Sequence, residues 1–136
     1  MRKSLSLAAV LGLVALPALA QPMTTAPEIR PILEATQSSW VALREYEGQD
    51  LLYFTHLLAW RCGLSEIRYG LNDAPPETVF AMEPCHLDTA QPNAITGADI
   101  YLIESLGSVQ SVSVEIIYDD GAVARMDYVR KAILMP

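Results

Sequence analysis

Thiol, imidazole and carboxylate side chains come closest together at residues 85–88, which read CHLD. A zinc site needs three or four such ligands, and the chain holds only two histidines and two cysteines. Calcium takes oxygen ligands, but no D-x-D-x-D-G loop is present to supply them. The aspartates in the expected loops are Asp88, Asp99, Asp119 and Asp120. We therefore expect no metal site and no cofactor.

Cys62 and Cys85 are the only cysteines, and we predict that they form a disulfide. An even number of cysteines in an exported chain favours pairing, because the thiols meet an oxidising environment. Closing a loop of about 24 residues stabilises a fold by roughly 3 kcal/mol in the chain-entropy model. The alternative is a single catalytic thiol, which would leave its well-placed neighbour without a role.

Catalytic motifs are scarce. His56 lies among apolar residues, and a general base would need a carboxylate or a second histidine converging on it. Without one, its imidazole is a core group hydrogen-bonded to a backbone carbonyl. No serine lies in a G-x-S-x-G motif, and no glycine loop is suited to phosphate. A small hydrolase that uses acidic side chains with His56 or His86 is the enzymatic alternative.

Three arginines suggest a binding face. Arg44, Arg61 and Arg68 fall on neighbouring segments, and each faces away from the main apolar side of its expected strand. Together with Tyr53 they form a candidate face suited to protein recognition or to an anionic ligand. The alternative is a solvated sheet face on which the arginines form cross-strand ion pairs with Glu45 and Glu66.

A second candidate binding element is the loop 86–99, the longest irregular stretch of the chain. Loops of this length in a compact domain are often functional. The polar residues that we assign to this candidate are His86, Asp88, Asn93 and Asp99.

Residues 1–20 are predicted to be a cleaved signal peptide. Arg2 and Lys3 supply a basic start, residues 5–16 a short apolar core, and residues 18–20 the small-x-small cleavage pattern ALA. The apolar core is too short to span a bilayer comfortably. We expect a periplasmic or secreted protein with no membrane span after cleavage.

Removal of this segment leaves residues 21–136, which we expect to form a single domain. The formal net charge changes from −7 to −9, because the segment carries two basic residues and no acidic one. So acidic a chain argues against nucleic acid and anionic membrane surfaces as partners. The sequence indicates no oligomeric state.

The remaining chain reads as one short helix followed by strands. Residues 25–28, TAPE, match a capping box and predict a helix from there to Ser38. The run 51–62, LLYFTHLLAWRC, is expected to be one long strand buried on both sides or changing sheets midway. The clearest alternation places Val112, Val114, Ile116 and Tyr118 inward. The expected strands cover 40–46, 51–62, 66–71, 78–83, 100–103, 108–118 and 122–129.

About seven strands without a βαβ rhythm predict an all-β fold. The expected architecture is an antiparallel β-sandwich, immunoglobulin-like or a partly open barrel, with one short N-terminal helix. In immunoglobulin domains the paired cysteines lie much farther apart and bracket a tryptophan, whereas here Trp60 precedes the first cysteine. Strand names are therefore not carried over from that family.

The pieces WVALREYEGQD, YFTHLLAWRCGL and SVQSVSVEIIYDDG resemble small exported bacterial proteins to which no activity is attached. The similarity covers most of the mature chain and includes the cysteine pair in WRCG and PC. It implies export but no chemistry. From the residues we predict a non-catalytic binding module that recognises another envelope or secreted protein, with a hydrolase or a structural envelope component as the alternatives.

Overall fold

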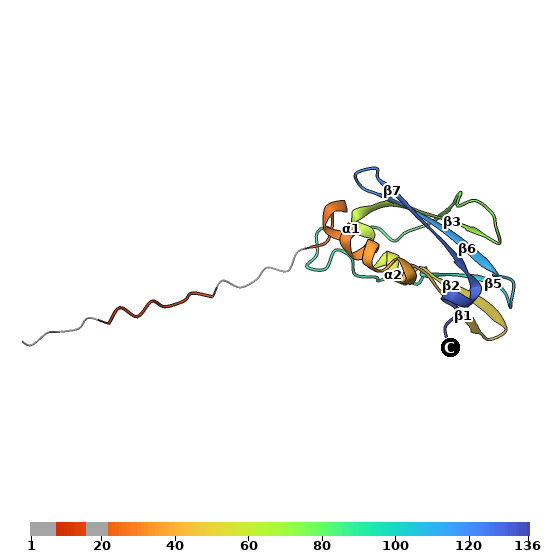
Figure 1. Ribbon diagram of the computed structural model, residues 1–136, viewed down its shortest axis with the longest axis horizontal. Coiled ribbons are helices and arrows are strands. Elements are labelled where there is room, and N and C mark those ends of the chain that lie inside the picture. Colours follow the sequence, from red (N-terminus) through yellow and green to blue (C-terminus); the bar gives the residue numbers. More distant parts are fainter. Residues whose placement is uncertain (1–7, 16–21) are drawn as a thin grey trace, which may run out of the picture.

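The computed structural model describes residues 8–15 and 22–136. The basic start and the cleavage site of the predicted signal peptide, within residues 1–7 and 16–21, lie outside the described residues. Residues 8–15 form no helix or strand, and the trace runs away from the body of the molecule (Figure 1). Their apolar side chains are exposed, with Leu13 97% accessible.

Seven strands form two antiparallel sheets, as the alternation of the sequence predicts. The smaller sheet has the order β1-β2-β5 and the larger one the order β4-β3-β6-β7. The strands are β1 (Ala42–Tyr46), β2 (Gln49–Tyr53), β3 (Leu64–Leu71), β4 (Thr78–Phe80), β5 (Tyr101–Ser105), β6 (Ser111–Tyr118) and β7 (Val123–Val129). The helices are α1 (Ala26–Ala35), η1 (Gln37–Ser39), α2 (Thr55–Leu58), η2 (Arg61–Gly63) and α3 (Arg130–Ile133).

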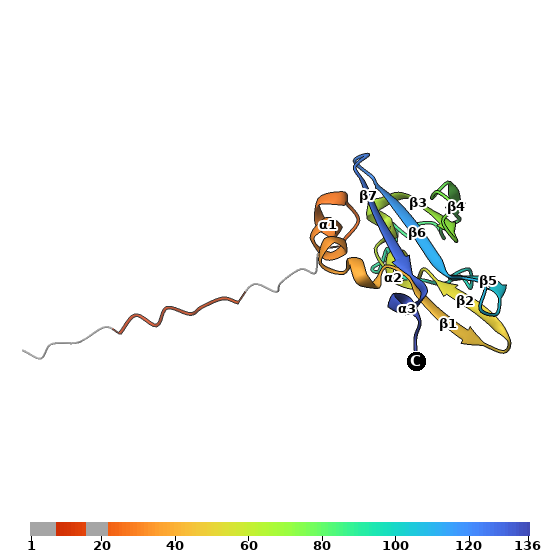
Figure 2. The same cartoon turned by 45° about the vertical axis from the view of Figure 1, so that its right-hand side comes forward.

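The core lies between the two sheets, which gives a sandwich-like all-β arrangement (Figure 1). In the smaller sheet, paired residues of β1, β2 and β5 put one row of leucines inward: Leu43, Leu52 and Leu102. In β6, burial alternates perfectly along the strand, so the inward residues are the four that its sequence predicts. α3 follows β7 and lies beside β1 (Figure 2).

The expected long strand over residues 51–62 is wrong. Only its first residues continue β2; the chain then forms α2 and η2. The amide of Leu58 donates to the carbonyl of Phe54, and that of Ala59 to the carbonyl of Thr55, which closes a helical turn. Leu57 and Leu58 are good helix formers, and the turn buries both of them in the core. A continuously apolar run is compatible with a strand or with a helix, and here the burial of Leu57 and Leu58 favours the helical turn.

The predicted N-terminal helix corresponds to α1, which ends at Ala35 and not at Ser38, and its first turn is capped differently from the capping box. The Thr25 hydroxyl donates to the carboxylate of Glu28 at 2.7 Å and does not cap a backbone amide. The amide of Ala26 instead donates to the carboxylate of Asp119 at 2.9 Å. Asp119 follows β6, so this cap joins α1 to the larger sheet. A carboxylate at a helix N-terminus also complements the helix dipole.

Asp50, which is fully buried, and Arg130, whose side chain is 15% exposed, form an ion pair where three parts of the chain meet. The Arg130 guanidinium donates to both oxygens of Asp50, at 2.7 and 3.0 Å. Asp50 also accepts hydrogen bonds from the amides of Gly107 and Val109, which precede β6. These hydrogen bonds, above all those from Arg130, outweigh the effect of burial and lower the pKa of Asp50 from its ordinary 3.8 to about 2.

Replacing Asp50 by asparagine is expected to lower the free energy of unfolding by about 2 to 3 kcal/mol, because the charge-assisted hydrogen bonds from Arg130 are lost and Glu45 is then its remaining acidic partner. Urea unfolding followed by tryptophan fluorescence measures this change. The control is Glu45→Gln, since Glu45 contacts the same guanidinium at 2.6 Å but is half exposed. That variant should change the free energy of unfolding by less than about 1 kcal/mol.

Asp50→Asn should also change how the free energy of unfolding depends on pH. In the unfolded chain the Asp50 carboxyl takes up a proton near 3.8, whereas in the folded protein it does so only near 2. Its stabilisation is therefore complete above 3.8 and is lost as the pH falls toward 2. Between about pH 5 and about pH 2 the wild type should lose more stability than Asp50→Asn. Equal losses of stability in the two proteins would contradict the lowered pKa of Asp50 in the folded state.

Candidate functional site

The structure separates the four residues of the predicted arginine face. Arg44 and Tyr53 lie together on the outward face of the smaller sheet, because their positions on β1 and β2 share one side of the ladder. Arg68 lies on β3 in the other sheet. Arg61 lies in η2 and is only 2% exposed, so its expected place on an exposed face is wrong.

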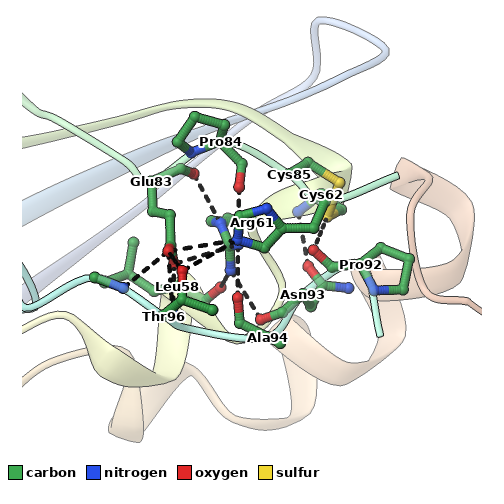
Figure 3. A network of polar contacts seen from close by, with 12 residues as sticks. Leu58, Arg61, Cys62, Glu83, Pro84, Cys85, Pro92, Asn93, Ala94 and Thr96 are labelled. Atoms are coloured by element: carbon green, nitrogen blue, oxygen red, sulfur yellow. Dashed lines mark hydrogen bonds and ion pairs between the residues drawn. A yellow bond between two sulfur atoms is a disulfide. The ribbon is translucent and has the colours of Figure 1, made fainter. Parts of the chain in front are cut away.

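Arg61 instead holds irregular backbone together (Figure 3). Its guanidinium has five N–H donors, and each meets a backbone carbonyl at 2.8 to 3.1 Å. Those carbonyls belong to Leu58, Glu83, Pro84, Asn93 and Ala94. The Glu83 carboxylate lies 3.5 Å from the same guanidinium and balances its charge. A buried arginine with every donor occupied is a structural residue.

The predicted disulfide is confirmed beside this arginine. Cys62 and Cys85 are bonded, with their Cα atoms 5.2 Å apart, and join η2 to the segment that follows β4. Asn93 completes the junction, since its side-chain oxygen accepts from the amide of Cys62 and its amide donates to the carbonyl of Met23. Gly63 lets α1 approach, because a Cβ there would lie 2.6 Å from Ile29 Cδ1.

The loop 86–99 is irregular, as expected, and its candidate residues have different surroundings. Asn93 serves the junction described above. Asp88 and Asp99 are exposed, and Asp99 lines a recess of about 310 Å³ together with Glu83. His86 Nε2 lies 3.4 Å from a carboxylate oxygen of Glu83. The loop therefore brings one histidine near one acidic residue.

Glu83 works mainly as a clamp on this loop. It accepts hydrogen bonds from the hydroxyl and amide of Thr96 and from the amide of Gly97. These bonds, first the one from the Thr96 hydroxyl, lower the pKa of Glu83 to about 2. A carboxylate with so low a pKa is a weak base, so the arrangement favours loop anchoring over proton transfer.

The outward face of the larger sheet is charged and paired. Arg68 contacts Glu66 at 2.7 Å and Glu115 at 3.9 Å. Arg125 contacts Asp127 at 3.1 Å. Glu66 and Asp127 lie two residues from their arginines on the same strands, so only the contact between Arg68 and Glu115 joins neighbouring strands. The face is solvated, as the alternative for the arginines expects, but most of its ion pairs lie within one strand. Arg68 belongs to this face.

The outward face of the smaller sheet is aromatic. We call Arg44, Tyr46, Tyr53, Tyr101 and Ile103 the tyrosine face. The rings of Tyr53 and Tyr101 lie 5.3 Å apart, and the Arg44 guanidinium lies 4.4 Å from the ring centre of Tyr46. Tyr46 is 45% exposed and Ile103 is 55% exposed. Only Arg44 and Tyr53 of these five are predicted from the sequence, because the strand register brings the other three beside them.

A groove of about 410 Å³ continues from the tyrosine face toward α2. Its lining is mainly apolar, with Trp40, Val41, Ala42 and Met135, and Arg44, Tyr53 and His56 add the polar groups. Burial lowers the pKa of His56. His56 Nε2 contacts the hydroxyl of Thr36 at 2.9 Å. Because that hydroxyl donates its only proton to the carbonyl of Ile32, Nε2 must be the donor of the neutral ring. His56 was expected to bond a backbone carbonyl; it bonds this hydroxyl instead.

Three general findings complete the description of the site. Across residues 8–15 and 22–136, no three His, Cys, Asp or Glu side chains come together in a way that could hold a metal ion. In the same described part of the chain, no helix combines the length and apolarity needed to cross a membrane. Comparison of the chain with models of protein families, with curated proteins and with solved structures finds no match.

The role of Arg61 predicts a large effect of a conservative change. Arg61→Lys keeps the charge but supplies three donors for five carbonyls, so at least two buried acceptors lose their bonds. The free energy of unfolding should fall by about 3 kcal/mol. Arg68→Lys is the control and should cost less than about 1 kcal/mol. Urea unfolding of both oxidised proteins tests this, and equal effects would refute it.

Proposed function

We propose that residues 21–136, released from the signal peptide 1–20, act as an exported, non-catalytic binding module that recognises another envelope or secreted protein. The tyrosine face is the recognition surface. The observation that carries the proposal is the gathering of three tyrosines, an isoleucine and an arginine on one outward sheet face.

The composition of this face supports protein recognition. Tyrosine and arginine are enriched among the residues that dominate binding energy in protein interfaces, because each combines a large contact area with hydrogen-bonding groups. The other sheet of the same molecule supplies an internal contrast, since its arginines are paired with acidic neighbours. An exposed apolar group of this kind is commonly an interaction site.

Export is supported by two features. A disulfide persists in oxidising compartments, which include the periplasm and the extracellular space. Residues 10–14 include four apolar side chains that are at least 84% exposed, which suits a segment removed before the domain works. The partner is then expected in the same compartment, and nucleic acid is not expected as a ligand of this acidic chain.

Site-specific photo-crosslinking in the cells that export the protein tests this function. Tyr46 is replaced by p-benzoylphenylalanine, which should give one dominant crosslink to a second protein after irradiation. The control places the same group at Arg125, on the charged face, where the side chain is 48% exposed. Purified partner should then bind purified module, and Tyr53→Ala should weaken that binding about tenfold or more.

Three outcomes of that experiment would count against the proposal. Equal crosslinking from positions 46 and 125 would show that the tyrosine face has no preference for a partner. No crosslink from either position would remove the recognition surface altogether. A crosslink only between copies of the chain would favour the structural envelope component instead.

A small hydrolase is the second candidate, and the 3.4 Å approach of His86 to Glu83 is what favours it. Purified mature protein is incubated with model esters, glycosides and peptides, alongside His86→Ala. The binding proposal expects no turnover by either protein. Turnover that disappears in His86→Ala would establish the hydrolase and overturn the non-catalytic assignment.

A further inference from the structure

Arg44 differs from the other arginines of the described chain. Five of these six arginines form an ion pair with an acidic side chain, whereas Arg44 has no such partner within residues 8–15 and 22–136. Its guanidinium instead lies against the ring of Tyr46. Stacking on a ring orients the planar group and leaves its N–H edge available to a carboxylate. Among the described residues of so acidic a protein, an arginine without an ion-pair partner is the exception.

The groove beside Arg44 supplies an apolar complement to this charge. Its volume of about 410 Å³ lies within the range of about 300–1,000 Å³ that is usual for ligand sites. Trp40, Val41 and Met135 give it apolar walls. His56 also lines the groove, and burial lowers its pKa, which disfavours the charged ring; Arg44 is therefore the cation among the lining residues. An apolar group with a carboxylate next to it matches both features.

We infer that the groove binds a large apolar side chain of a partner protein and that Arg44 pairs with an acidic residue next to it. The ligand is therefore a peptide segment that combines an apolar anchor with a neighbouring carboxylate. This inference rests on the proposed function, because it specifies what the tyrosine face recognises.

A peptide fits better than a small molecule because the apolar surface does not end at the groove. Tyr101 and Ile103 continue it across the sheet to β5, and both are exposed. A small carboxylate in the groove would leave this surface uncovered, whereas a chain of several residues extends over it at about 3.3 Å per residue. The exposed tyrosines then contact the residues that flank the anchor.

Selection from a random peptide library displayed on phage tests the inference directly. Immobilised mature protein should enrich peptides in which an aromatic or large aliphatic residue lies within about two positions of Asp or Glu. Synthetic versions of the enriched peptides are then titrated by fluorescence anisotropy. Enrichment without an acidic residue, or no enrichment at all, would overturn the inference.

Variants of the protein separate the two parts of the site. Arg44→Gln should bind the enriched peptides about tenfold more weakly than the wild type does. It should bind each peptide as well as the version in which Asn or Gln replaces the acidic residue. Thr55→Phe, at an exposed position on the groove wall, should weaken both peptides alike. Arg125→Gln, on the charged face, is the control and should bind as the wild type does. Unchanged binding by Arg44→Gln would refute the ion pair.

A further titration distinguishes the source of the carboxylate. Dodecanoate carries the same chemistry without a peptide. If it binds with Arg44-dependent affinity and the library yields no peptide, the site takes a free fatty acid and the peptide inference is wrong. A crosslinked partner at position 46 together with failure of the peptide selection would keep the proposed function and reject only this inference.

Discussion

The buried guanidinium of Arg61 binds carbonyl groups from three segments that belong to no common sheet: the end of α2, the chain after β4, and the middle of the loop 86–99. Backbone carbonyls in irregular structure have no ladder to satisfy them, and burying them without donors is costly. One side chain with five fixed donors solves this problem for five residues at once. The adjacent disulfide joins η2 to the chain after β4, and Asn93 joins the same region to the N-terminal segment. The long loop can be irregular because this junction holds it.

A second polar junction holds the sandwich at the start of β2. Asp50 and Arg130 connect that strand to the segment before β6 and to the start of α3. Both junctions lie where the chain passes from one element to the next, and both contain a buried charged side chain. The outward faces of the two sheets carry different groups. One sheet carries ion pairs exposed to water, and the other carries tyrosines and Arg44, which has no ion-pair partner in the part of the chain that the structure describes. This asymmetry supports recognition by a single face.

The candidate site shows how residues of the same type acquire different roles. Arg44, Arg61 and Arg68 look alike in the sequence, each within a mixed apolar and polar segment. In the structure one lies beside a groove, one is buried among carbonyls and one pairs with glutamates. The difference depends on which groups surround each guanidinium, and those groups come from distant parts of the chain. Tyr101 and Ile103 also belong to the site through a distant part of the chain. They lie on β5, which pairs with β2 although about fifty residues separate the two strands.

The sequence by itself determined the features that depend on neighbours along the chain. Alternation located the strands, most clearly in β6, the proline-containing start predicted α1, and the two cysteines predicted their bond. Only the tertiary structure decided that residues 51–62 turn from strand to helix, because an apolar run without a period suits either backbone and the burial of Leu57 and Leu58 selects one. The tertiary structure alone also decided that Arg61 is buried and that the five residues of the tyrosine face, from three strands, lie together. Hydrogen bonds and packing between distant segments have no signature in local spacing.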